Sequence, residues 1–311
     1  MTLLKVLGRY VLTLAAASVL IFLLMRAVPG NPARVALGVN ATEESVAELT
    51  TTMGLDRPLL AQYGQWLGGL LTGDFGVSLA SQQNITAQVI DRAQVSLILV
   101  GVALLLALVI AIPLGMWTAQ RKASISNALT QLGIAIPSFL VGIILVAIFA
   151  VQLGWLPANG WSPPNQGVGS FLSHLVMPVI ALALVQGAIL TRYVRSAILD
   201  VLNQDYIRTA RALGQSPTGA LWRHGLRNAA LPVLTVAGVQ FTTLIVGAVV
   251  IEEVFVIPGL GSMLLDAVSV RDLTTVQSLV MVLVAFTLTI NALTDAAYRL
   301  IDPRLRQGAR S

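Results

Sequence analysis

The chain has 311 residues, of which 56% are hydrophobic and only 11% are charged, and its formal net charge is +5. Soluble domains usually carry about 25% charged residues, so this composition excludes an ordinary soluble protein and predicts an integral membrane protein. The chain contains no cysteine, which excludes disulfides and thiolate metal sites.

Six apolar runs are long enough to cross a bilayer, which takes about 20 residues as a helix. The first ends beside Arg26, whose long side chain can reach the membrane interface. Residues 154–169, GWLPANGWSPPNQGVG, divide a long uncharged stretch into the third and fourth runs, and Pro137 is expected to kink the third. The six predicted spans are 10–28, 95–119, 128–151, 171–193, 230–251 and 274–297.

Lysine and arginine are distributed unequally between the two sides of this topology. The side that holds both chain ends carries 14 of these residues. The other side carries 5, which are Arg26, Arg34, Arg57, Arg92 and Arg271. Because short cytoplasmic loops are enriched in Lys and Arg, both termini are predicted to be cytoplasmic. The positive charge therefore reflects membrane orientation and does not indicate a nucleic-acid partner.

The predicted organisation has four parts. Residues 1–28 form a cytoplasmic N-terminus and the first span, and residues 29–94 form an extracytoplasmic helical segment. Residues 95–298 form the core with the remaining spans, a cytoplasmic loop at 194–229 and an outer loop at 252–273. Residues 299–311 form a cytoplasmic tail.

The segment 29–94 contains two predicted helices. Thr42 is a candidate N-cap and Gly54 a candidate stop for the first, and Asp56 is a candidate cap for the second, with Pro58 in its first turn. Residues 59–71 carry leucine, tyrosine and tryptophan at helical spacing. This apolar face suits either the membrane interface or packing against the other spans, and the sequence leaves both open.

Signatures of catalysis and of ion coupling are weak. The chain has no Gly-x4-Gly-Lys-Ser/Thr phosphate-binding loop. Its two histidines are His174 and His224, and the adjacent pair Ser173–His174 cannot form an attacking nucleophile and base. We therefore expect no catalytic residue. An ion-coupled carrier remains the alternative of another class, although the spans show no pair of buried carboxylates.

Four spans each carry one amide side chain that could line a polar path or form hydrogen bonds between helices. These residues are Gln131, Gln186, Gln240 and Asn291.

One long polar insert, DYIRTARALGQSPTGALWRHGLRN at 205–228, interrupts the apolar second half of the chain. Asn203 or Asp205 can cap a short helix that Gly214 ends, and Ser216 with Pro217 can begin a second helix. Tyr206, Ala210 and Leu213 fall on one predicted face of the first. A helix of this length is marginal in water, so it must pack on its own bundle, on lipid head groups or on a partner protein.

The insert resembles the cytoplasmic signature loop of ABC-importer permeases of the dipeptide/oligopeptide/nickel group. YIRTARALG followed by HGLRNAALPVL carries this resemblance, with a loose match of residues 208–214 to the general pattern Glu-Ala-Ala-x3-Gly. Further motifs of the group follow in order along the chain. They are RAVPGNP at 26–32, GDFGVS at 73–78, IPSF at 136–139, EEVFVIPGLG at 252–261 and DPRLR at 302–306.

The resemblance implies a type I importer permease fold in a bacterial cytoplasmic membrane. Its implied partners are a paralogous permease, two cytoplasmic ATPases that hold ATP and Mg²⁺, and an extracytoplasmic solute-binding protein. The implied solute is a di- or oligopeptide, with nickel, glutathione or another small solute as the alternative. This chain would bind no cofactor or metal itself.

The resemblance also assigns roles to residues. The helix in the insert would be a coupling helix seated in one ATPase, formed by Asp205, Tyr206, Arg208, Thr209, Ala210, Arg211, Ala212, Leu213 and Gly214. The glycine-punctuated stretch after the fifth span is interpreted as a partly re-entrant outer gate that faces the binding protein, with Glu252, Glu253, Pro258, Gly259, Gly261 and Leu264 as its candidate residues.

Overall fold

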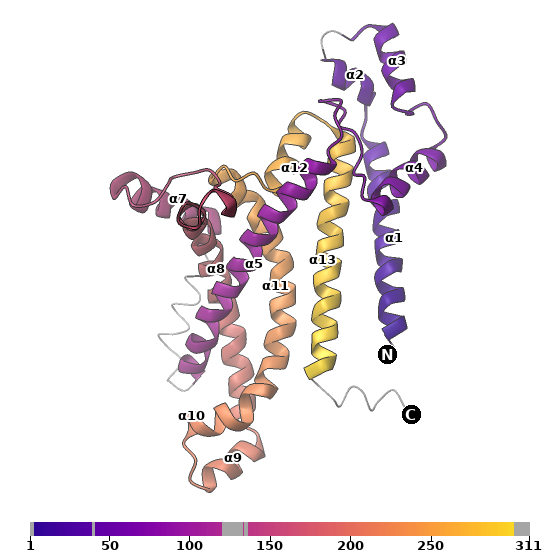
Figure 1. The fold of residues 1–311 in the computed structure, drawn as a ribbon. Helices are drawn as coiled ribbons and strands as arrows, with labels where there is room; N and C mark the ends of the chain where they lie inside the picture. The colour runs from indigo at the N-terminus through magenta and orange to yellow at the C-terminus, as the bar shows by residue number, and fades with distance from the viewer. Residues whose placement is uncertain (1–2, 39–40, 120–132, 134–135, 302–311) are drawn as a thin grey trace. The chain divides into compact units, whose positions relative to one another are not determined.

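The computed structural model describes residues 3–38, 41–119, 133 and 136–301. In this part of the chain every extended regular element is helical, and the single β-type pairing is an isolated bridge between Val77 and Asn84. The chain divides into two compact units, one of residues 1–96 and 258–289 and the other of residues 97–257 and 290–311. The element order is shown in Figure 1.

The long helices agree with the predicted spans. Among the described residues five helices are long and apolar enough to cross a membrane, and they contain all or nearly all of the first, second, fourth, fifth and sixth predicted spans. Several extend beyond the apolar runs, because neighbouring polar residues continue the same helix. They are α1 (Leu3–Ala27), α5 (Thr86–Ala119), α8 (Val168–Leu202), α11 (Leu226–Val254) and α13 (Leu273–Ile301).

The third predicted span, 128–151, is only partly described. Residues 120–132 and 134–135 lie outside the described residues. The described part is α7 (Ser138–Leu145) followed by the π-helical segment η2 (Val146–Gln152). Pro137 occupies the N-cap position of α7 with extended backbone (φ −62°, ψ 141°), so it begins the described part of this span. The kink expected there stays a prediction, because most of the residues before Pro137 lie outside the described residues.

Two of the caps predicted for the segment 29–94 are confirmed and one is wrong. Thr42 caps α3 (Glu43–Thr52) through a reciprocal pair of bonds with Ser45, and Gly54 follows α3 in the left-handed region (φ +64°). In contrast, α4 (Leu59–Thr72) has Pro58 at its N-cap and no side-chain cap. Asp56 therefore lies too early to cap α4, because the helix starts only after the proline. A short helix, α2 (Pro32–Leu37), precedes α3.

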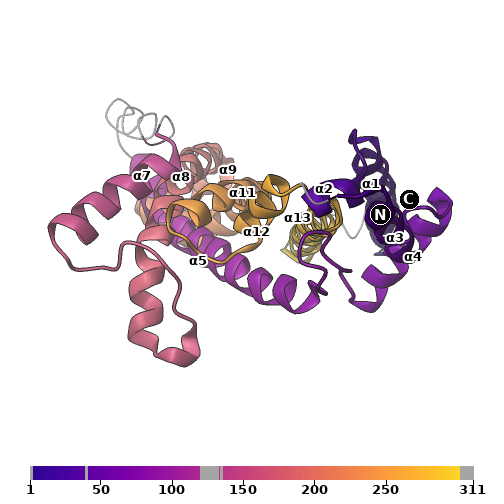
Figure 2. The same cartoon turned by 90° about the horizontal axis from the view of Figure 1, so that it is seen from above.

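Within the first unit, one face of α4 packs against α1, and the two helices lie beside each other when viewed from above (Figure 2). The rings of Tyr63 and Trp66 contact Phe22 with centroid distances of 5.4 and 6.3 Å, and the hydroxyl groups of Tyr63 and Ser18 are 2.8 Å apart. Other α4 side chains remain open, with 85% of Leu60 exposed. The structure therefore supports packing of the aromatic face against another span, here α1, over placement of that face at the membrane interface.

The short helix α12 (Leu260–Ser269) belongs to the core of the first unit. Leu260 and Met263 pack in a buried cluster with residues of α5 and α13. The buried Asp272 carboxylate accepts hydrogen bonds from Leu79 N–H, from the Ser78 hydroxyl, and from the N–H and hydroxyl of Thr275. The bonds from Thr275 cap the start of α13. The loop before α5 is thereby tied to the corner between α12 and α13.

The second unit is built around α8 and α11, which pack closely on each other and on α7, and α5 adds side chains to its buried cluster. Its buried cluster is rich in alanine and runs from Ala107 in α5 through Leu190 and Ile198 in α8. Gly115 lies so close to Val194 that an added Cβ would come within 2.6 Å of that side chain. Small residues of this kind let membrane helices approach one another, because lipid supplies no hydrophobic force between them.

Candidate functional site

The polar insert folds as a helical hairpin at the end of α8 and α11 (Figure 1). Its first helix, α9 (Asp205–Ala212), follows α8 after only two residues, Asn203 and Gln204. Gln204 occupies the N-cap position and makes no side-chain cap bond, so the predicted capping by Asn203 or Asp205 is wrong. Asn203 instead ends α8.

The predicted stop at Gly214 is confirmed. Gly214 has φ +88°, a left-handed conformation that an L side chain rarely adopts. Its N–H bonds the carbonyl of Arg211 at 3.0 Å, and the N–H of Gln215 bonds the carbonyl of Ala210 at 3.2 Å. These two bonds form a Schellman motif, which satisfies carbonyls at the helix end and turns the chain sharply.

The second helix of the hairpin is joined to α11 without a break. Ser216 caps α10 (Pro217–Ala220), as predicted, by accepting a hydrogen bond from Gly219 N–H at 3.1 Å. A π-helical segment, η4 (Leu221–Gly225), follows directly and α11 begins at the next residue. The helical path therefore runs from Pro217 to Val254.

The inner side of α9 packs on its own unit. Ile207 is fully buried and Ala210 is 6% exposed, and both join the cluster that contains Val201 and Leu221. Gly225 makes this packing possible, because an added Cβ would lie 2.8 Å from both Val201 Cγ1 and Leu221 Cδ1.

This packing corrects the face predicted for α9. Ala210 faces inward with Ile207, whereas Leu213 is 80% exposed and Tyr206 is 39% exposed. The sequence reasoning overlooked Ile207, although its i, i+3 spacing from Ala210 is a helical signal. The Tyr206 hydroxyl also accepts a hydrogen bond from Asn228 at 2.9 Å, which ties α9 to the start of α11.

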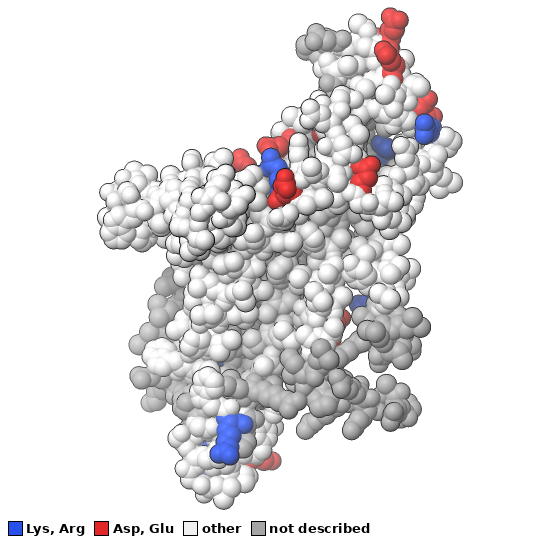
Figure 3. Space-filling view, viewed as in Figure 1, with Lys and Arg blue, Asp and Glu red and all other residues white. Residues whose placement is uncertain are grey.

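The outer side of α9 presents charge and one large apolar side chain. Arg208 and Asp205 form an exposed i, i+3 ion pair at 3.5 Å, and Arg211 and Ala212 are also exposed. Lys and Arg atoms gather at the surface of this hairpin in the view of Figure 3. An exposed pair of this kind adds little stability, so its charges remain available to another surface.

The predicted outer-gate residues are divided between the two units. In the second unit, Glu252 is buried and Glu253 is exposed at the end of α11. α11 ends at Val254, and two residues later Val256 has φ +52°, which is a strained conformation for a β-branched residue. The neighbouring loop docks here, because Gly160 N–H bonds the Phe255 carbonyl at 2.8 Å.

In the first unit, Pro258 is exposed, whereas Gly259 and Gly261 are buried at the start of α12. α5 holds this helix end: Ser96 Oγ accepts from Leu260 N–H at 2.8 Å, and Arg92 lies 3.2 Å from Ser262 Oγ.

Leu264 is half-buried against the α5–α13 cluster. The second half of the predicted outer loop therefore forms a packed helix of the first unit, and its role as a gate stays a prediction.

The four predicted amides have different surroundings. Gln186 in α8 and Gln240 in α11 are buried, and the Oε1 atom of each accepts no hydrogen bond from the described residues. Asn291 is exposed on α13, and Gln131 lies outside the described residues. Within the described part of the chain, neither Oε1 atom forms a hydrogen bond between helices, and the place of both residues in a solute path stays a prediction.

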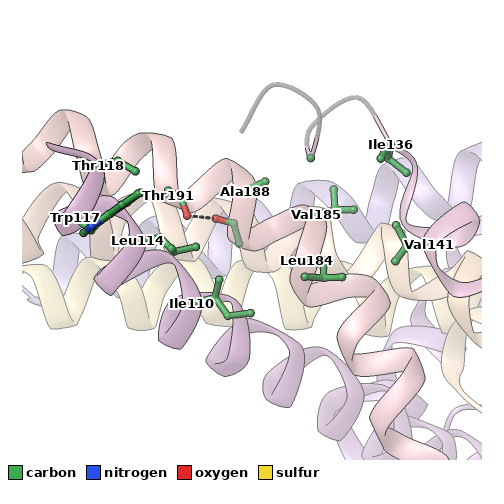
Figure 4. Close-up of a pocket in the computed structure, with 12 residues that line it drawn as sticks. Ile110, Leu114, Trp117, Thr118, Ile136, Val141, Leu184, Val185, Ala188 and Thr191 are labelled. Carbon is green, nitrogen blue, oxygen red and sulfur yellow. Dashed lines mark hydrogen bonds between the residues drawn. The ribbon is translucent and has the colours of Figure 1, made fainter. Parts of the chain in front are cut away.

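The second unit also contains an apolar cavity of about 350 Å³ between α5, α7 and α8 (Figure 4). Its walls include Ile110, Trp117 and Leu184, and the hydroxyl of Thr191 at its edge is occupied by a 2.6 Å bond to the Gly187 carbonyl. The described walls are almost wholly apolar and do not suit a charged or zwitterionic ligand, which would lose its hydration there.

Comparison with known sequences matches nearly the whole chain to one type of protein. Residues 107–307 match the family described as binding-protein-dependent transport system inner membrane component, and residues 2–100 match the N-terminal part of such membrane components.

Three curated relatives illustrate the match. The probable peptide ABC transporter permease protein y4tP of Sinorhizobium fredii is 37% identical, covering 94% of this chain and 95% of the relative. The oligopeptide transport system permease protein AppB of Bacillus subtilis is 38% identical with the same coverage. The glutathione transport system permease protein GsiC of Salmonella choleraesuis is 35% identical, again covering 94% of this chain and 95% of the relative.

A solved structure shares the fold. It is described as the crystal structure of an amino acid ABC transporter with histidines, and it superposes with a TM-score of 0.53 at 17% identity, covering 69% of this chain and 94% of that chain. At this identity the likeness concerns the fold alone.

Proposed function

This chain belongs to the family of inner membrane components of binding-protein-dependent transport systems, and we propose that it is the permease subunit of an ATP-driven importer of di- and oligopeptides. As a multi-pass membrane protein it would form half of the translocation pathway. A paralogous permease would supply the other half, as the resemblance to ABC-importer permeases implies.

The observation that carries the proposal is the rigid attachment of the α9–α10 hairpin. α9 shares a buried cluster with α8 through Ile207, Ala210 and Val201, and α10 continues through η4 into α11. A displacement of the hairpin would therefore be passed to the adjoining ends of two long helices. Transporters that alternate between two states need such a rigid-body connection between the energy source and the spans.

The outer face of α9 is the proposed docking surface for a cytoplasmic ATPase. Leu213 offers an apolar side chain that is 80% exposed, and Arg208 and Arg211 offer charge-assisted hydrogen bonds to carboxylate or carbonyl acceptors. ATP and Mg²⁺ would be held by two ATPase subunits, and ATP-driven closure of those subunits would move the hairpin.

The orientation follows from the charge distribution. With 14 of the 19 basic residues on the side of the hairpin and the termini, that side is proposed to be cytoplasmic. The segment with α2, α3 and α4 would then lie outside, where a solute-binding protein delivers its cargo.

The relatives support a peptide as the solute. Two of the three are named as peptide or oligopeptide permeases, and the third is named for glutathione. Glutathione is therefore the second candidate.

The test is ATP-dependent uptake into proteoliposomes that contain both permeases and both ATPases, with the binding protein added outside. Labelled dialanine, a labelled longer peptide and labelled glutathione would be compared in one preparation. Uptake of the peptides with ATP supports the proposal. Uptake of glutathione alone would make glutathione, and not a di- or oligopeptide, the solute of this importer. Uptake without ATP would overturn the ATP-driven mechanism.

A further inference from the structure

A polar cavity of about 360 Å³ lies inside the first unit, apart from the hairpin. Arg26 at the end of α1 contributes to its wall, together with the turn after α3, the helix α4, the loop before α5 and the first turns of α13. Amide side chains are its most frequent polar groups: Gln62, Gln65, Gln82 and Gln277. Binding sites for small molecules begin at about 300 Å³, so this space fits a small ligand.

Arg26 supplies a cation that nothing in the described part of the chain neutralises. Its guanidinium lies 5.1 Å from the centroid of the Phe22 ring, which fixes its direction, and its buried Nε has no hydrogen-bond acceptor there. A long arginine at the end of a span was expected to reach outward to the interface, but here it lines the cavity. A half-buried cation loses part of its hydration, so an anionic group in the cavity would stabilise it.

Gln62 supplies a fixed acceptor on the same wall. Its Nε2 donates to the carbonyls of Leu55 and Arg57 at 3.0 and 2.7 Å, which fixes the orientation of the amide. Its Oε1 is then buried without a donor among the described residues. A buried acceptor in this state costs free energy until a donor reaches it.

Asp74 supplies a negative charge to the same cavity. Its Oδ1 accepts hydrogen bonds from Gly76 N–H at 3.0 Å, from Asn84 Nδ2 at 2.8 Å and from Thr86 Oγ1 at 3.1 Å. These bonds, led by that from Gly76, hold the pKa of the Asp74 carboxyl below its ordinary value. The carboxylate is therefore ionised at neutral pH and is held in one position.

We infer that this cavity is a site for a small zwitterionic solute, with Arg26 binding its carboxylate and Asp74 facing its ammonium group. One cation and one anion on a wall rich in amides match the two charged ends and the peptide bond of a dipeptide. In the proposed topology the site would lie outside, where the binding protein would release solute, so it would receive solute before the path through the spans. This inference rests on the proposed import of peptides, and the cavity volume favours dipeptides over long oligopeptides.

The test uses the complete transporter in nanodiscs and a single cysteine in this chain, which has none of its own. Thr52 is exposed and borders the cavity, so Thr52→Cys reports on occupancy through its rate of labelling by an aqueous maleimide, read on this chain by mass spectrometry. Dialanine is expected to slow labelling. Dialanine amide, which lacks the carboxylate, and N-acetyl-dialanine, which lacks the ammonium group, are expected to protect much less.

Arg26→Gln, combined with Thr52→Cys, is expected to raise the dialanine concentration for half-protection by about tenfold to about a hundredfold, as is usual for loss of a hydrogen bond to a charged group. Arg26→Lys should restore part of the protection, because it keeps the charge. The matched control is Arg34→Gln, since Arg34 lies in the same unit, is exposed and pairs with Glu43 away from the cavity. It should leave protection unchanged.

Equal protection by dialanine and its amide, or unchanged protection in Arg26→Gln, would overturn the inference. A lipid phosphate is the other source of an anion. Nanodiscs of phosphatidylcholine alone are therefore compared with nanodiscs that contain phosphatidylglycerol. Protection of the cysteine that requires phosphatidylglycerol and does not change with dialanine would show that Arg26 binds a lipid phosphate. Dialanine uptake is measured in the same preparation. Uptake without protection overturns only the cavity site, whereas absence of any peptide uptake overturns the proposed function.

Discussion

Replacement of Leu213 by serine separates docking from folding at the hairpin. Leu213 is 80% exposed and belongs to no buried cluster among the described residues, so Leu213→Ser should leave the fold of α9 intact. Complete burial of a leucine side chain is worth about 1.5–3 kcal/mol. Four-fifths of that surface remains to be buried by a partner, so full burial on docking would contribute about 1.2–2.4 kcal/mol. This corresponds to a loss of about 8-fold to about 60-fold in ATPase affinity.

The assay is the equilibrium binding of the purified ATPase to the permease pair in nanodiscs, followed by solute-stimulated ATP hydrolysis. Leu71→Ser is the matched control, because Leu71 is also 80% exposed but lies on α4 in the segment predicted to be outside. It should not change ATPase affinity. Unchanged affinity and coupled hydrolysis in Leu213→Ser would refute the assignment of this face to docking.

Three further predictions concern the hairpin and the topology. Gly214→Val should destabilise the hairpin turn by about 1–2 kcal/mol through backbone strain alone, since an added Cβ meets no atom there; Gly214→Asn should cost less, and thermal unfolding of the purified permease pair compares the two. Ala210→Trp should disrupt the packing under α9, because Ala210 is buried in its own unit; increased proteolysis of the hairpin before any ATPase is added checks this, and a resistant hairpin would contradict it. Cysteine at Thr50 should react with an impermeant thiol reagent only from outside the cell and cysteine at Ser311 only from the cytoplasm; labelling of position 50 from the cytoplasm alone would invert the proposed topology.

The helices that sequence reasoning placed correctly are those fixed by local signals. Long apolar runs predict spans because the bilayer demands length and hydropathy, and these are properties of contiguous residues. Gly214, Thr42 and Ser216 were correctly placed because each supplies a backbone conformation or a cap bond that few other residues provide. Asp56 failed because α4 starts only after Pro58, and residue type alone does not fix where the first helical turn begins.

The features that sequence reasoning missed depend on residues that are distant along the chain. The inward side of α9 is set by Gly225 and Val201, which leave room for Ile207. Helical spacing alone did not distinguish the face with Ile207 from the face with Tyr206, since both contain apolar side chains. The polar cavity combines Arg26 with Gln277, which are far apart in the sequence, so no local pattern predicts it.

The unbroken helical path from Pro217 to Val254 acts mechanically as a single strut. At about 1.5 Å per residue it is about 57 Å long, and an axially hydrogen-bonded rod of that length resists stretching. A lateral displacement of about 5 Å at the Pro217 end would therefore tilt the helical path by about 5°, or shift its Val254 end. The π-helical segment η4 and Pro232 interrupt its regular bonding. Bending should concentrate at these two positions, so they determine how much of a displacement of the hairpin is transmitted to the Val254 end of the helical path.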